Sequence, residues 1–93
     1  MKVVIDDIEI QVRNISYRQK KGLQGEYRDV YSKSNKIKQK DFNLLLASVA
    51  EIAFSDPKEA FKDYDGLTED KILIQTLMDY LEISDESKKI KGD

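Results

Sequence analysis

Histidine, cysteine and tryptophan are absent from this sequence of 93 residues, and proline occurs once. Without cysteine no disulfide can form, so the usual support of small secreted domains is missing. Without histidine or cysteine we expect no zinc site, and neither a Ser-His-Asp nor a Cys-His nucleophile can be assembled. No Gly-rich phosphate loop and no distinctive carboxylate pair is present. We therefore expect no catalysis, no metal and no cofactor, and a protein that works by binding another macromolecule.

Long apolar runs are also missing. The run near the N-terminus, Val3-Val4-Ile5, is far too short for a signal peptide or a membrane span. We therefore expect a cytoplasmic protein with no membrane partner. Hydrophobic residues make up 40% of the chain and charged residues 37%, which is typical of one folded domain over residues 1–93.

The charge is segregated along the chain, although the net charge is only −2. Residues 11–40 carry nine basic and two acidic residues, whereas residues 41–86 carry twelve acidic residues and three lysines. A nucleic-acid interface is one interpretation of the basic segment, because Tyr17, Tyr27 and Tyr31 could stack on bases. It is the less favoured one, since the net charge is acidic and two of these tyrosines lie on a predicted core face. Contact with the acidic surface of another copy or partner is favoured instead.

Strand signals occupy residues 1–15. Ile8, Ile10 and Val12 alternate with polar residues, which is the pattern of a half-buried strand. Asp6-Asp7 can form the tight turn before it, so a β-hairpin that packs on helices is predicted.

A basic helix follows. Ser16 is expected to cap it, with Gln19 completing a capping box. One face of this helix is apolar, formed by Leu23, Tyr27, Val30 and Tyr31. Gly22 and Gly25 each disfavour a helix, so either another backbone approaches closely there or the helix breaks. The polar segment 32–40 is predicted to be a loop.

The central helix is expected to begin at Asp41 and to be apolar almost all round, and therefore buried on several sides. Asp56-Pro57 then opens a short helix that ends near Asp65-Gly66.

The last helix is expected to start at a Thr68 cap, with Leu67 and Ile72 packed around it. Its apolar face comprises Leu73, Leu77, Tyr80 and Leu81, extended by Ile74 and Met78. The stretch 63–66, Asp-Tyr-Asp-Gly, fails as a calcium loop because apolar residues fall at ligand positions in either register.

Together these patterns predict an α+β fold that is mainly α. A short N-terminal β-hairpin over residues 1–15 is followed by a compact bundle of three to five helices over residues 16–86. Residues 87–93 are expected to form a flexible tail.

The motifs follow one another in a characteristic order along most of the chain. A strand pair with an Asp-Asp turn leads through Val12-Arg13-Asn14-Ile15-Ser16-Tyr17-Arg18-Gln19 into the basic helix. The apolar central helix, an Asp56–Phe61 element, a Gly66–Asp70 segment and a Leu-rich helix ending in Ser87-Lys88-Lys89 come next. This order resembles that of the small tail assembly chaperones of tailed bacteriophages.

The resemblance implies a non-catalytic chaperone in the host cell cytoplasm. It would bind the hydrophobic, helical tape measure protein, keep it soluble and help to recruit tail tube protein during tail assembly. The resemblance also implies self-association, which the segregated charge favours independently. The alternatives are another virion or baseplate component, a protein-interaction adaptor, or a nucleic-acid-binding regulator.

Client helices are expected to bind an apolar groove. The residues expected to line this groove, or the core beside it, are Leu23, Tyr27, Tyr31, Leu73, Leu77 and Leu81.

Overall fold

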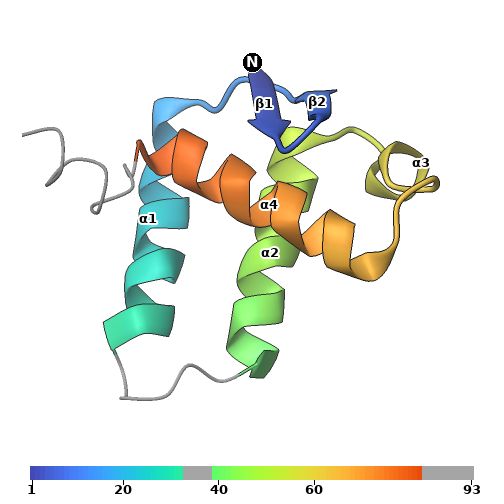
Figure 1. Cartoon of the computed structure of the whole chain (residues 1–93). Coiled ribbons are helices and arrows are strands. Elements are labelled where there is room, and N and C mark those ends of the chain that lie inside the picture. Colours follow the sequence, from blue (N-terminus) through green and yellow to red (C-terminus); the bar gives the residue numbers. More distant parts are fainter. Residues whose placement is uncertain (33–38, 83–93) are drawn as a thin grey trace, which may run out of the picture.

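A two-stranded hairpin and four helices make up the part of the chain that the computed structural model describes, residues 1–32 and 39–82. The elements are β1 (Lys2–Ile5), β2 (Ile8–Gln11), α1 (Tyr17–Ser32), α2 (Gln39–Ala53), α3 (Pro57–Ala60) and α4 (Gly66–Leu81). α1 and α2 run antiparallel, α4 lies across both, and the hairpin packs against α4 (Figure 1). The predicted fold class is confirmed. Most of the predicted loop, the end of the predicted helical body and the predicted tail lie outside the described residues.

The hairpin has the predicted turn at Asp6-Asp7. β1 and β2 are antiparallel, with Val3 opposite Ile10 and Ile5 opposite Ile8. Asp6 takes a φ of 52°, in the left-handed region that aspartate tolerates better than most residues. Side chains alternate across β1, so Val3 is buried and Val4 is exposed.

α1 begins with the predicted capping box. The Gln19 backbone N–H donates to Ser16 Oγ at 3.1 Å, and the Ser16 N–H donates to Gln19 Oε1 at 3.0 Å. Both hydrogen bonds satisfy donors that a helix start leaves without partners.

Both alternatives for Gly22 and Gly25 are wrong. α1 continues unbroken through the two glycines, and no atom lies within 4 Å of a Cβ built at either position. Both residues are exposed, so tertiary contacts elsewhere on α1 hold the helix together in spite of their poor helix propensity.

Gly22→Ala and Gly25→Ala are therefore each expected to stabilise the protein by about 0.5–1 kcal/mol, because alanine restricts the unfolded chain without a clash. Urea denaturation monitored by circular dichroism measures the change. Gly66→Ala is the matched control: it is also unobstructed but is the first residue of α4, so a smaller gain is expected. If Gly22→Ala or Gly25→Ala lowers the stability, the space around that glycine is not open as described.

α2 departs from its predicted form in two respects. It begins at Gln39, two residues before Asp41. The side-chain amide of Gln39 donates a hydrogen bond to Asn43 Oδ1 at 2.9 Å across the first turn. It is less buried than predicted, since Leu44 is 58% exposed and Ala47 is also exposed. Its buried residues are Leu45, Leu46, Val49, Ala50 and Ala53, and it contacts α1, α3 and α4.

The two later helices have aspartate caps. Asp56 accepts from the Glu59 N–H at the start of α3, as predicted, but α3 ends at Ala60 and turns follow it. The predicted Thr68 cap of α4 is wrong: Asp65 is the cap, and its carboxylate accepts from the Thr68 N–H at 2.8 Å. Hydrogen bonds from Thr68 lower the pKa of the Asp65 carboxyl. The predicted hydrophobic staple is also wrong, because Leu67 is within the helix and 67% exposed.

One core joins the elements. Its centre includes Val3 from β1, Leu23 from α1, Val49 from α2 and Ile72 from α4. The buried Thr76 hydroxyl donates to the Ile72 carbonyl at 2.7 Å. Within residues 1–32 and 39–82, every buried side-chain nitrogen or oxygen has a hydrogen-bond partner.

Arg13 connects three elements through hydrogen bonds. Its guanidinium donates to the carbonyls of Glu51, Ile52 and Phe54, at 2.6–3.2 Å, at the C-terminus of α2. The Tyr80 hydroxyl of α4 donates to the Arg13 carbonyl at 2.6 Å. Arg13 therefore holds the exit of the hairpin against the ends of α2 and α4.

No helix in the described ranges has both the length and the apolar character needed to cross a membrane.

Candidate protein-binding site

The six residues proposed for a groove separate into two groups. Leu23, Leu73, Leu77 and Leu81 belong to the core and are at most 8% exposed. Of these four, Leu73 also lines a hollow between α2 and the start of α4. Tyr27 is half-buried against the core, and Tyr31 is exposed on α1.

Tyr27 and Tyr31 form an aromatic pair. Their ring centroids are 4.5 Å apart with an interplanar angle of 40°, and Tyr31 is 43% exposed. Partial burial, and then the neighbouring Tyr27, raise the pKa of the Tyr31 hydroxyl. That hydroxyl therefore stays protonated at neutral pH and can donate a hydrogen bond at the edge of the apolar pair.

α4 carries a second accessible apolar stripe. Ile74 is half-buried, Met78 is exposed, and Glu82 follows at the next position of the same i, i+4 row. Lys20 of α1, on the same side of its helix as Tyr27 and Tyr31, forms an ion pair with Glu82. This hydrogen bond lowers the pKa of the Glu82 carboxyl.

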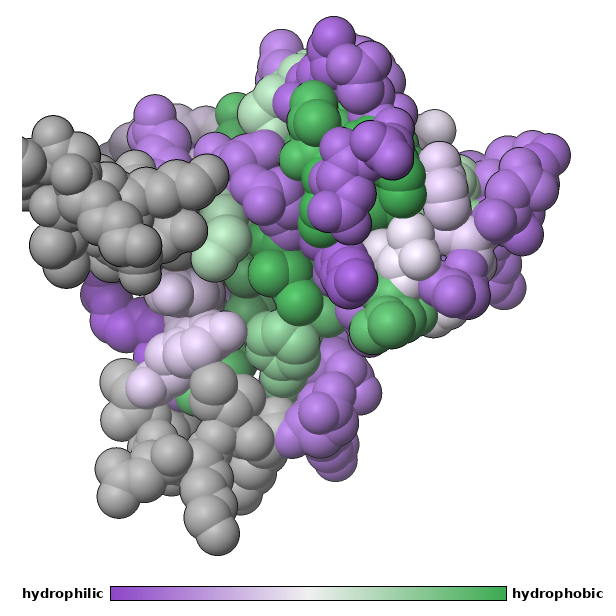
Figure 2. Space-filling view, in the orientation of Figure 1, coloured by the Kyte–Doolittle hydropathy of each residue, from purple (hydrophilic) through white to green (hydrophobic). Residues whose placement is uncertain are grey.

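The Lys20–Glu82 ion pair joins α1 to the C-terminal end of α4, at one end of each stripe. We call the four apolar residues of the two stripes, Tyr27, Tyr31, Ile74 and Met78, the apolar shelf. Figure 2 shows apolar side chains gathered along α4 and just below it, over the space between α1 and α2. The sequence placed Ile74 and Met78 on the core face, and only the crossing of the helices leaves them accessible.

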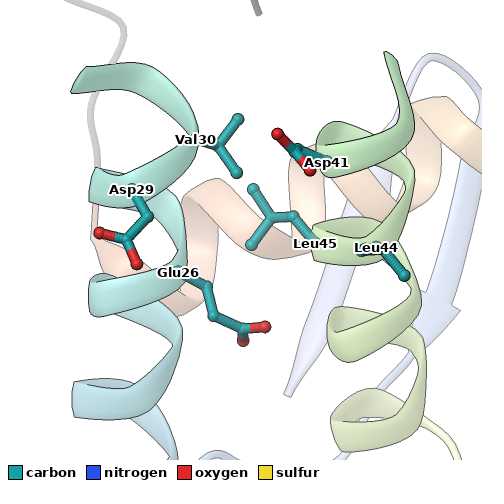
Figure 3. A pocket seen from close by; sticks show the side chains of 6 residues that line it. All are labelled: Glu26, Asp29, Val30, Asp41, Leu44 and Leu45. Carbon is teal, nitrogen blue, oxygen red and sulfur yellow. The ribbon is translucent and has the colours of Figure 1, made fainter. Parts of the chain in front are cut away.

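A different surface lies between α1 and α2. A hollow of about 170 Å³ is lined by Glu26, Asp29, Val30, Asp41, Leu44 and Leu45. Figure 3 shows the three carboxylates around the apolar side chains, with α4 behind the helix pair. Glu26 also accepts a hydrogen bond from Ser48 Oγ at 3.0 Å, which links α1 to α2. This hollow therefore opens on the side of the pair away from α4.

A second, larger hollow of about 520 Å³ lies between α2 and the start of α4. Its floor is apolar, and its carboxylates are those of Glu51, Glu69 and Asp70. The exposed Leu44 and Ala47 of α2 separate the two hollows, because each lines one of them. We call the two hollows and this ridge the acidic α2 surface; among the described residues, its lining includes six carboxylates and no lysine or arginine.

The cations of α1 face elsewhere. Arg18, Lys21 and Arg28 are exposed on the outer side of the helix, and we call them the basic face of α1. Lys21 Nζ lies 5.5 Å from the ring centroid of Tyr17, which is 75% exposed. Among the described residues the salt bridges join Lys2 to Glu9, Lys20 to Glu82 and Lys62 to Glu59, so none involves this face.

The acidic α2 surface was missed by sequence reasoning. Glu26 and Asp29 belong to the basic segment of the sequence, and only the antiparallel packing of α1 on α2 places them beside Asp41. Over residues 1–32 and 39–82 no cluster of three or more acidic side chains has the spacing to hold a metal ion. The apolar and acidic side chains that line the two hollows offer apolar contact and charge complementarity to a ligand.

Comparisons with known proteins found no match: the chain matches no protein-family model, no curated protein sequence and no solved structure.

Proposed function

We propose that this protein is a non-catalytic chaperone of bacteriophage tail assembly that binds an apolar helix of a tape measure protein on the apolar shelf. The observation that supports this function is the shelf itself, where an aromatic pair and two aliphatic side chains stay accessible beside a complete core. The order of motifs along the chain, which resembles that of tail assembly chaperones, supports the choice of client.

The shelf suits a helix as its ligand. A bound helix presents apolar residues at i, i+3, i+4 and i+7, and two crossing stripes on α1 and α4 can contact such a row. Met78 is unbranched and adapts to different partner shapes, while the tyrosines combine a large apolar ring with a polar edge. The resemblance implies a client that is hydrophobic and helical, which such a surface can bind.

Co-expression with the tape measure protein of the same genome tests the function. We expect the two proteins to co-purify, and the client to move from the insoluble to the soluble fraction. A client that neither co-purifies nor becomes more soluble would refute the proposal. Retention of this protein in finished phage particles would also refute it, because a chaperone leaves and a virion component stays.

Substitutions on the shelf test the site. Tyr31→Glu and Met78→Glu are expected to weaken client binding by about tenfold or more, since each places a charge in the apolar contact. Val4→Glu is the matched control, because Val4 is an apolar residue of the hairpin that is 52% exposed. If all three variants bind the client equally well, the apolar shelf is excluded as the binding site. The function itself is then judged by the co-expression result.

A further inference from the structure

The acidic α2 surface and the basic face of α1 are complementary in charge but cannot meet within one molecule. The side of α1 that faces α2 carries Glu26 and Val30. Arg18, Lys21 and Arg28 are exposed on the same helix, and none of them lines the hollow between α1 and α2. Within residues 1–32 and 39–82, these two surfaces can therefore be paired only between molecules and not within one.

The two surfaces also match in length. Arg18 and Arg28 are ten residues apart on α1, and Asp41 and Glu51 are ten residues apart on α2. Both separations correspond to about 15 Å along a helix axis. A helix laid along the acidic α2 surface can therefore bring its cations near the carboxylates of both hollows.

We propose that copies of this chain associate through a heterologous contact, in which the basic face of α1 in one copy docks on the acidic α2 surface of another. Exposed Leu44 and Ala47 supply the apolar centre of the contact, and the carboxylates surround it. Such a contact leaves one unused surface at each end, so it can add further copies or close into a ring. The proposed contact does not depend on the proposed function, because it uses none of the four residues of the apolar shelf.

The contact is expected to be sensitive to salt, because exposed charges are screened over about 10 Å at about 0.1 M salt. Sedimentation velocity over a range of protein concentrations measures it. We expect the average mass to rise with concentration at about 0.05 M salt and to fall to that of the monomer at about 0.5 M salt. A protein that stays monomeric in both buffers would overturn the proposal.

Two charge-reversal variants identify the surfaces. Arg18→Glu with Arg28→Glu alters only the basic face, and Glu51→Lys with Asp70→Lys alters only the acidic α2 surface. All four side chains are exposed, so circular dichroism spectra and urea midpoints close to those of the unmodified protein are expected. Each double variant alone is expected to associate at least about tenfold more weakly.

Mixing the two double variants is the decisive measurement. Each keeps the surface that the other has lost, so an equimolar mixture is expected to associate although neither variant does so alone. A mixture that stays monomeric, while the unmodified protein associates, would overturn the pairing of these two surfaces. Binding of a DNA or RNA oligonucleotide by the monomer is measured as well. If that binding is sensitive to salt and is lost only in the Arg18 and Arg28 double variant, the proposed contact is overturned and the basic face is assigned to nucleic acid.

Discussion

Leu23→Ala is expected to lower the free energy of unfolding by about 2–5 kcal/mol, because it removes a buried side chain and leaves a cavity. Leu23 is 1% exposed and packs at the centre of the core. For a small domain this loss is a large share of the total stability, so part of the protein is expected to be unfolded at room temperature. Urea denaturation at low temperature, monitored by circular dichroism, measures the change.

Leu44→Ala is the matched control for this prediction. The chemical change is the same, but Leu44 is largely exposed on α2, so the expected change is within about 0.5 kcal/mol. Equal losses at the two positions would show that Leu23 is not the core residue described above. The comparison also separates a core role for Leu23 from a role in client binding, which would leave stability unchanged.

Arg13→Ala is expected to lower the free energy of unfolding by about 2–3 kcal/mol, since it removes charge-assisted hydrogen bonds to carbonyls that a helix end leaves without partners. The same cation opposes the partial negative charge at the C-terminus of α2. Thermal and urea denaturation measure the loss. Arg13→Lys is expected to recover only part of the stability, because an ammonium group keeps the charge but lacks the planar fork that reaches three carbonyls.

The control for Arg13 is Arg18→Ala. Arg18 is an exposed arginine on the basic face of α1, so its loss is expected to change stability by no more than about 0.5 kcal/mol. If Arg13→Ala and Arg18→Ala change the free energy of unfolding equally, the hydrogen bonds of Arg13 contribute little more to stability than hydrogen bonds to water would. If only Arg13 matters, an arginine of the basic segment has a structural role that its charge alone does not reveal.

The two proposed surfaces predict different behaviour under the same conditions. The apolar shelf depends on hydrophobic contact, which salt does not screen, whereas the contact between copies depends on exposed charge. High salt is therefore expected to separate copies from one another while a bound client helix is retained.

Local patterns in the sequence determined the elements of this fold. Alternating residues predicted the hairpin, and side-chain oxygens at Ser16 and Asp56 predicted two helix starts. The apolar rows of α1 and α4 contain the leucines that the structure buries, although the sequence left open whether they form the core or a groove. Each of these depends on neighbours within a few residues, so the printed sequence contains the necessary information.

The wrong predictions also have local causes. Asp65 and Thr68 both qualify as caps, and the sequence does not show which backbone conformation the chain takes between them. The glycines of α1 suggested a close approach or a break, yet packing on the opposite face holds an unbroken helix.

Only the tertiary structure decided the surfaces. Ile74 and Tyr27 are half-buried and Met78 and Tyr31 are exposed, although all four lie on apolar faces in the sequence. The packing of α1 on α2 moves Glu26 and Asp29 out of the basic segment and into the acidic α2 surface. Helix periodicity gives the direction of a side chain relative to its own axis, but exposure and local charge depend on which helix lies opposite.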